Sequence, residues 1–256
     1  MKKKKICLLG DFQCIDSGGH PIEISLAKEI GVIAVLALAQ DHSCARVKMI
    51  DLLWSDRCGE QGRSSLRHSL WSLKSKLNRE SPRLLQSDRK RVSLDVDACV
   101  IDTCEFANLA TSDRQEDLER AISIYRGDLL EDLVVHDREW EAWIGIQRSR
   151  LQMAYAECLY QLSIRYLAGR DVGKLIGTGL QLIAHNQLSE EGHRALMEAY
   201  SLAQQKSLAL QQYERYRDMI HRELGCFPEP GLRQLYERIK SDRSPGDVGN
   251  ASRRFG

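Results

Sequence analysis

Apolar residues recur at helical spacing in the first third of the chain, most regularly over residues 62–78. Four leucines there are separated by four, three and four positions: Leu66, Leu70, Leu73 and Leu77. At about 100° per residue they fall on one narrow face of a helix. The pattern therefore predicts a helix over residues 62–78 that buries this leucine face.

The opposite face of the predicted helix is polar and basic, and no carboxylate follows until Glu80. Surface helices ordinarily mix acidic with basic residues, and the DNA major groove admits one helix. The composition therefore favours a DNA-reading helix over an ordinary amphipathic surface helix, which remains the alternative. The outward positions proposed to meet DNA are Arg63, Ser64, Arg67, His68, Trp71, Ser72, Lys74 and Ser75.

The elements around this helix follow from alternating and helical patterns and from turn residues. Strands at residues 5–9, 12–15 and 21–24 predict a small antiparallel sheet. Ser25 is expected to cap a buried helix over residues 26–39, and a short helix over 47–54 precedes a loop at 55–62. Two strands at 83–86 and 92–96 enclose a tip at 87–91 that carries three positive charges: Arg89, Lys90 and Arg91.

Sheet, three helices and a terminal hairpin make a winged helix-turn-helix, and residues 5–101 resemble its OmpR-type variety. The motifs that carry the resemblance are IDLLW at 50–54, LRHSLWSLKSKL at 66–77 and the basic hairpin tip. It implies that helix 62–78 enters the major groove and that the tip lies along phosphates or the adjacent minor groove. Where the family often has arginines, this chain has Trp71, Ser72 and Lys74, so a different base preference is expected. Trp71 either contacts thymine methyl groups or packs against the hairpin.

The remaining residues show helical periodicity throughout. Predicted helices cover residues 118–125, 175–184, 192–202, 208–224 and 232–239, with one or two long helices over 140–167 that end at Gly169. Gly225 is the expected C-cap of the helix before it. Helices joined by short turns fit tetratricopeptide-like stacking. Three glycines at positions 173, 177 and 179 predict a loosely packed helix pair, since glycine costs about 1 kcal/mol against alanine in a helix.

Three stretches in this half resemble the bacterial transcriptional activation domain: LERAISIYRGDLLEDL at 118–133, EWEAWIGIQRSRL at 139–151 and ALQQYERYRDMIHRELGCFPEPGLRQLYERI at 209–239. An OmpR-type winged helix fused to this domain is the signature of the SARP family of antibiotic regulatory proteins. The resemblance implies a transcriptional activator that binds tandem direct repeats of double-stranded DNA at a promoter, self-associates there as a dimer, and contacts RNA polymerase.

The expected fold class is mainly α. An OmpR-type winged-helix domain (α+β) is assigned to residues 1–101 and an all-α, tetratricopeptide-like helical-repeat domain to 102–240. Residues 241–256 are rich in Ser, Gly, Arg and Asp and are expected to be a disordered tail or a linker. Because the first strand starts at Lys5, no receiver domain is expected before the winged helix, and control by aspartate phosphorylation within the chain is not expected.

Charge is distributed unevenly. Residues 1–101 hold 17 Lys and Arg against 12 Asp and Glu, and residues 102–256 hold 20 against 24. Residues 63–91 alone hold nine against two. The overall charge of +1 therefore hides a basic segment, which favours a polyanionic partner for the first half of the chain.

Motifs of catalysis and metal binding are missing from the sequence. It has no phosphate-binding loop, no His-Glu-x-x-His and no Gly-x-Ser-x-Gly, and its eight cysteines form no Cys-x-x-Cys pair. No enzyme activity, cofactor, metal site or membrane partner is expected, and the location is expected to be the cytoplasm. Two alternatives remain open: an interaction scaffold whose winged helix no longer binds specific DNA, and the regulatory N-terminal part of a larger protein.

Overall fold

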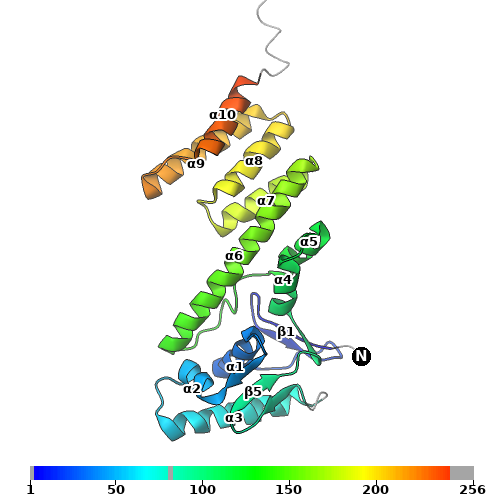
Figure 1. The fold of residues 1–256 in the computed structure, drawn as a ribbon, viewed down its shortest axis with the longest axis vertical. Helices are drawn as coiled ribbons and strands as arrows, with labels where there is room; N and C mark the ends of the chain where they lie inside the picture. The colour runs from blue at the N-terminus through cyan, green and yellow to red at the C-terminus, as the bar shows by residue number, and fades with distance from the viewer. Residues whose placement is uncertain (1–2, 80–82, 243–256) are drawn as a thin grey trace, which may run out of the picture. The chain divides into compact units, whose positions relative to one another are not determined.

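The computed structural model describes residues 3–79 and 83–242, which form two compact units with separate hydrophobic cores (Figure 1). The first unit ends at Tyr155 and the second begins at Ala156, so the boundary lies inside one long helix. The division at residue 101 expected from the sequence stays a prediction. The expected tail lies, from residue 243 onward, outside the described residues.

The first unit has the expected order of sheet, three helices and hairpin, which confirms the winged helix-turn-helix. Two helices and half of a third complete it. Its elements are β1 (Lys4–Cys7), β2 (Gln13–Ile15), α1 (Ala27–Leu38), β3 (Ser43–Ala45), α2 (Arg46–Leu53), α3 (Gly59–Leu77), β4 (Leu85–Ser87), β5 (Arg91–Leu94), β6 (Cys99–Ile101), α4 (Asp102–Ala110), α5 (Gln115–Ile124) and the first half of α6 (Arg138–Ala168).

Helix α1 lies at the centre of this unit. Residues 29–37 are all buried, as the apolar run in the sequence predicted. Gly31 lets its neighbours approach closely, because a Cβ there would lie 2.6 Å from a methyl carbon of Leu53 and 3.4 Å from the ring of Trp140. The predicted cap was wrong: Leu26 is the N-cap residue, and it makes no side-chain cap hydrogen bond.

The N-terminal sheet differs from the prediction in its third strand. β1 pairs with β2 antiparallel and with β6 parallel, in the register Lys4–Cys99 and Ile6–Ile101. The strand expected at residues 21–24 is only an isolated bridge from Pro21 to Ile15. Proline has no N–H to donate to a ladder, and β6 takes the place beside β1.

The second sheet is the wing. It has the order β3-β5-β4 with antiparallel pairs, so the predicted hairpin is confirmed as β4 and β5. The third strand, β3, was not predicted from the sequence. Its three residues are too few for a readable alternation, and its pairing with β5 joins segments that are far apart in the chain.

The second unit is entirely helical within residues 156–242, which agrees with the expected helical-repeat class. It contains the second half of α6, then α7 (Val172–His185), α8 (Glu190–Leu202), α9 (Lys206–Leu224) and α10 (Pro230–Ser241) (Figure 1). α6 is one continuous helix that ends before Gly169, and Gly225 is the left-handed C-cap of α9 with φ 67°. Both stops were predicted.

The glycines of α7 have a packing role that the sequence did not reveal. A Cβ on Gly179 would lie 3.1 Å from the carbonyl oxygen of Gly192 and 3.0 Å from a methyl carbon of Leu196. The backbones of α7 and α8 therefore meet at this glycine pair. A loose helix pair does not follow from the glycine content, because Gly179 is the residue that permits close contact.

His193 is buried inside the second unit. Its Nε2 lies 3.1 Å from the carbonyl oxygen of Gln187, and its Nδ1 lies 2.7 Å from Nε2 of Gln212. A neutral ring that donates from Nε2 and accepts at Nδ1 satisfies both contacts. Burial lowers the pKa of His193, which favours this neutral form.

Candidate nucleic-acid interface

The buried face of α3 is the predicted leucine face. Leu66, Leu73 and Leu77 are fully buried and Leu70 nearly so. The helix begins at Gly59, three residues before the predicted start. Gly62 lies within the helix. A Cβ there would lie 2.6 Å from a methyl carbon of Ile50, so this glycine permits close contact between α2 and α3.

The earlier start adds Glu60 to the outward face, which corrects the prediction that no acid interrupts it. The Oε1 atom of Glu60 lies 3.1 Å from Nη2 of Arg67, and its Oε2 lies 3.5 Å from Nη1 of Arg63. All three side chains are largely exposed. Exposed ion pairs contribute about 0–1 kcal/mol, so DNA phosphates can compete with Glu60 for both arginines.

The other outward positions form a continuous polar surface around an exposed tryptophan. Trp71 is 69% exposed, so packing against the wing does not account for it, and its ring stacks on His68 with centroids 6.3 Å apart. Ser64 and Ser75 are exposed, whereas Ser72 is half-buried. A large, flat, exposed side chain on this helix can meet base edges or thymine methyl groups.

The wing is attached directly to the end of α3. The side chain of Asn78, the C-cap residue, accepts a hydrogen bond from Leu85 N at 2.9 Å and donates one to Leu85 O at 3.0 Å. The ammonium of Lys74 donates to the hydroxyl of Ser87 at 2.8 Å. These bonds fix β4 against the helix, and they commit the head of Lys74 to the wing rather than to the outward face.

Two further lysines hold the same end of α3. Lys76 Nζ lies 3.0 Å from Oε2 of Glu29, which is fully buried in α1, and Lys4 Nζ donates to the carbonyl oxygen of Leu77 at 2.7 Å. Removing one partner of a buried ion pair costs about 3–5 kcal/mol. Part of the positive charge of residues 63–91 thus positions the helix and does not face outward.

The wing tip carries two cations that remain available and one that is paired. Arg89 and Lys90 are exposed, and within residues 3–79 and 83–242 no ion pair holds either of them. The guanidinium of Arg91 lies 2.8 Å from a carboxylate oxygen of Asp41 and donates to the hydroxyl of Ser43 at 2.8 Å. The three predicted tip residues therefore lie together, with Arg91 turned back toward β3.

The turn at the tip is organised by Asp88. Its Oδ1 accepts the backbone N–H groups of Arg91 at 2.7 Å and Lys90 at 2.6 Å. These hydrogen bonds hold the pKa of Asp88 below its ordinary value, so the carboxylate stays ionised. The guanidinium of Arg46, at the start of α2, donates to the carbonyl oxygen of Asp88 at 3.3 Å. Sequence reasoning missed Arg46, because only the unpredicted pairing of β3 with β5 brings it to the wing.

The turn before α3 is held by the segment that begins α6. Asp137 is buried, and it accepts hydrogen bonds from the backbone N–H and the hydroxyl of Ser55, both at 2.9 Å. Trp140, one helical turn further on, packs into the core around α1. Residues outside the winged helix thus help to fix the turn from which α3 starts.

The described residues contain no group of three or more His, Cys, Asp or Glu side chains that could hold a metal ion. Within residues 3–79 and 83–242, no helix combines the length and the apolar character needed to cross a bilayer.

A family model described as the bacterial transcriptional activator domain matches residues 105–240. A curated relative, the transcriptional regulatory protein MoaR1 of Mycobacterium tuberculosis (strain ATCC 25618 / H37Rv), is 25% identical over 240 residues, which are 86% of this chain and 74% of the relative.

A solved structure of Mycobacterium tuberculosis EmbR, in complex with a low-affinity phosphopeptide, resembles the chain with a TM-score of 0.72 at 24% sequence identity. The match covers 94% of this chain and 65% of the EmbR chain. This chain therefore spans less than two thirds of EmbR, and at that identity the likeness concerns the fold.

Proposed function

The chain belongs to the bacterial transcriptional activator domain family, and from this premise we propose that it is a DNA-binding transcriptional activator. Its first 101 residues would be the reader and residues 102–240 the domain for self-association and for contact with RNA polymerase. Both partners are what the family implies, and the cytoplasm is the compartment in which a bacterial regulator meets them. No enzyme activity is part of the proposal.

The outward face of α3 is the observation that carries this proposal. Arg67, His68 and Trp71 lie exposed on one surface, on a helix whose leucine face anchors it in the core. We assign base contacts to this surface and phosphate contacts to the wing. The assigned residues are Arg63, Ser64, Arg67, His68, Trp71, Ser72 and Ser75 on the helix, Lys74 between helix and wing, and Arg89, Lys90 and Arg91 on the wing.

A second candidate is a protein-interaction scaffold that has lost specific DNA binding. The pairing of Arg63 and Arg67 with Glu60 favours it, since that carboxylate offsets positive charge on the face that would meet DNA. The exposed cations Arg89 and Lys90 weigh against it.

Footprinting the protein on the DNA upstream of its own gene would separate the two candidates. We expect Arg67→Ala to lower affinity for the protected site about tenfold, because a base contact is worth about 1–3 kcal/mol. The melting temperature should barely change, because the leucine face is intact. The double variant Arg67→Ala with Trp71→Ala should retain only the salt-sensitive binding of a basic patch. Full affinity in both variants would leave the scaffold as the better account.

A further inference from the structure

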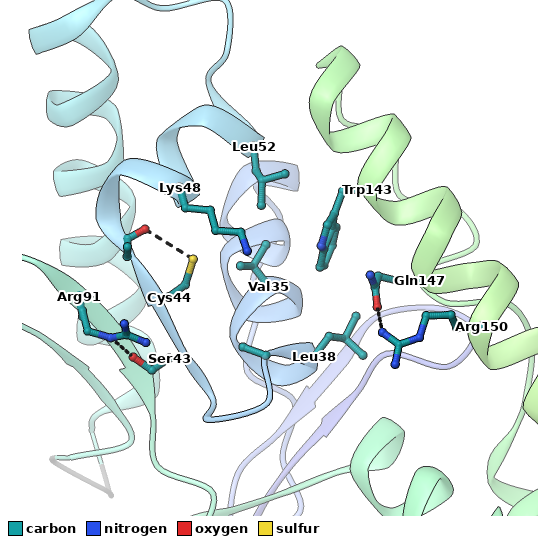
Figure 2. Close-up of a pocket in the computed structure, with 12 residues that line it drawn as sticks. Val35, Leu38, Ser43, Cys44, Lys48, Leu52, Arg91, Trp143, Gln147 and Arg150 are labelled. Atoms are coloured by element: carbon teal, nitrogen blue, oxygen red, sulfur yellow. Dashed lines mark hydrogen bonds between the residues drawn. The ribbon is translucent and has the colours of Figure 1, made fainter.

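A cavity of about 300 Å³ lies within the first unit, between the winged helix and the first half of α6 (Figure 2). Its apolar wall comes from α1, α2 and α6 and includes Val35, Leu38, Leu52 and Trp143. Figure 2 shows Lys48 reaching from α2 into this space, with Trp143 on the α6 side. The cavity is therefore bounded by the DNA-reading module on one side and by the family-matched helix on the other.

The charged groups that line the cavity are all cations: Lys48, Arg91 and Arg150. Arg150 contacts only the amide oxygen of Gln147, at 3.5 Å, among the bonds found for the described residues. Within residues 3–79 and 83–242, no carboxylate forms an ion pair with Lys48 or Arg150. A hollow lined by one sign of charge concentrates ions of the opposite sign.

The negative charge that balances such cations ordinarily comes from Asp or Glu, and one carboxylate, that of Asp41, lies close to them. Asp41 pairs with Arg91 at 2.8 Å but does not line the cavity. The positive charges of Lys48 and Arg150 therefore face a partly apolar space without an ion-pair partner among the described residues. The thiol of Cys44 also lines the cavity. Burial raises its pKa, whereas the positive charges of Lys48 and Arg91 lower it. The apolar wall and the cations together define an amphipathic site.

We propose that this cavity binds a small carboxylate with an apolar body, and that its binding weakens the contact of the wing with DNA. The carboxylate would lie between Lys48 and Arg150, and the apolar body against Trp143 and Leu52. Binding pockets range from about 300 to 1,000 Å³, so the volume suits a molecule of the size of benzoate or a short fatty acid.

Arg91 supplies the connection to DNA. It lines the cavity and is also a cation of the wing. In the structure Asp41 already holds the guanidinium. A bound carboxylate adds a second anion on that side, which keeps the guanidinium from moving out to a phosphate. This part rests on the proposed function, whereas binding of the carboxylate does not.

The binding step is tested on the full chain without DNA, by calorimetric titration at constant ionic strength. The probes are benzoate, hexanoate, neutral benzamide and inorganic phosphate. We expect one benzoate or hexanoate per chain, bound about tenfold or more tightly than benzamide, a difference set by the charge. No saturation with either carboxylate would overturn the proposal. Phosphate that binds as tightly as the carboxylates would overturn the role of the apolar wall.

Two variants locate the site. Lys48→Gln and Arg150→Gln change exposed side chains, so folding should survive. Each should weaken carboxylate binding by about tenfold. The matched control is Arg138→Gln, which removes an exposed arginine at the start of α6 that does not line the cavity. An equal loss in the control, or none in the two variants, would place the carboxylate elsewhere and overturn the assignment.

The coupling step is tested by DNA titrations over a range of salt concentrations. Benzoate at a concentration that just saturates the unmodified chain should lower its log–log salt slope by about 0.9, the value of one phosphate contact, and should lower the slope of Lys48→Gln less. An unchanged slope would overturn the coupling. Weaker DNA binding by Arg150→Gln without benzoate would assign the cavity to DNA and overturn the proposal. Should the chain bind no DNA at all, the proposed function fails while the calorimetric titration still decides the cavity.

Discussion

At the scale of single residues, Glu60 sets how much positive charge α3 presents. It pairs with Arg63 and Arg67 on the outward face, and all three side chains lie in solvent. DNA bound at the proposed interface would have to displace this carboxylate from the two arginines or be repelled by it. Glu60 therefore offsets part of the positive charge of Arg63 and Arg67, and both arginines stay exposed for the proposed contact with DNA.

We expect Glu60→Gln to tighten DNA binding by about two- to fivefold, the range that an exposed ion pair of about 0–1 kcal/mol allows. The change removes a negative charge that faces phosphate, so it should act on specific and random DNA alike. Parallel titrations against both kinds of duplex measure this gain.

The control for this variant is Glu116→Gln, which removes the same charge from an exposed pair with Arg114 beside α5. It should leave DNA affinity nearly unchanged. An equal gain in both variants would attribute the effect to net charge and would contradict a local role for Glu60.

The same residues show where the sequence was informative. The leucine face of α3 was predictable because burial imposes a helical period, and Leu66 and Leu70 obey it. The start of α3 at Gly59, which places Glu60 on the helix, was missed because two glycines, Gly59 and Gly62, indicated a loop. Gly62 permits close contact with Ile50 of α2. Such a contact between two helices leaves no pattern in the local sequence.

At the scale of elements, the wing depends on pairings between distant segments. The hairpin β4–β5 was visible as two short apolar stretches around a charged turn. Its third strand, β3, was not, and neither was β6 beside β1, because each is a three-residue strand completed only by a remote partner. The pairing of neighbouring strands, such as β4 with β5, was thus predictable, whereas the pairing of strands that are remote in the sequence was not.

The wing gives the second prediction. Replacing Arg89 and Lys90 with alanine should weaken binding to every DNA sequence and lower the log–log salt slope by about 0.9 for each phosphate that the tip no longer neutralises. Adding Arg91→Ala should lower the slope further only where DNA draws Arg91 away from Asp41. Affinity measured between low and moderate salt gives these slopes.

The sequence preference of the double wing variant serves as its internal control. Preference for the footprinted site should persist, since base contacts are assigned to α3. An unchanged slope would mean that the tip does not lie on DNA.

At the scale of the whole molecule, the reader and the family-matched half are not independent. Asp137 and Trp140, which precede and begin α6, contact the turn before α3 and the core around α1. α6 then continues into the second unit as one helix. A single helix, α6, therefore continues from the residues that hold the turn before α3 into the second unit, whose helices are proposed to mediate self-association.

A lone winged helix reads few base pairs, and single modules bury only a modest surface, so specificity requires more than one protomer. The family resemblance implies protomers on tandem direct repeats, and half-sites one helical turn apart place them on the same side of the duplex. We expect cooperative binding of two protomers, which inserting about half a turn between half-sites should abolish. Removing one half-site should give the same affinity as the inserted spacing, because both leave one protomer bound alone. Binding titrations with the duplexes of original spacing, of inserted spacing and of one half-site test this prediction. Cooperativity that survives the insertion would mean that the contact between protomers is flexible or lies elsewhere.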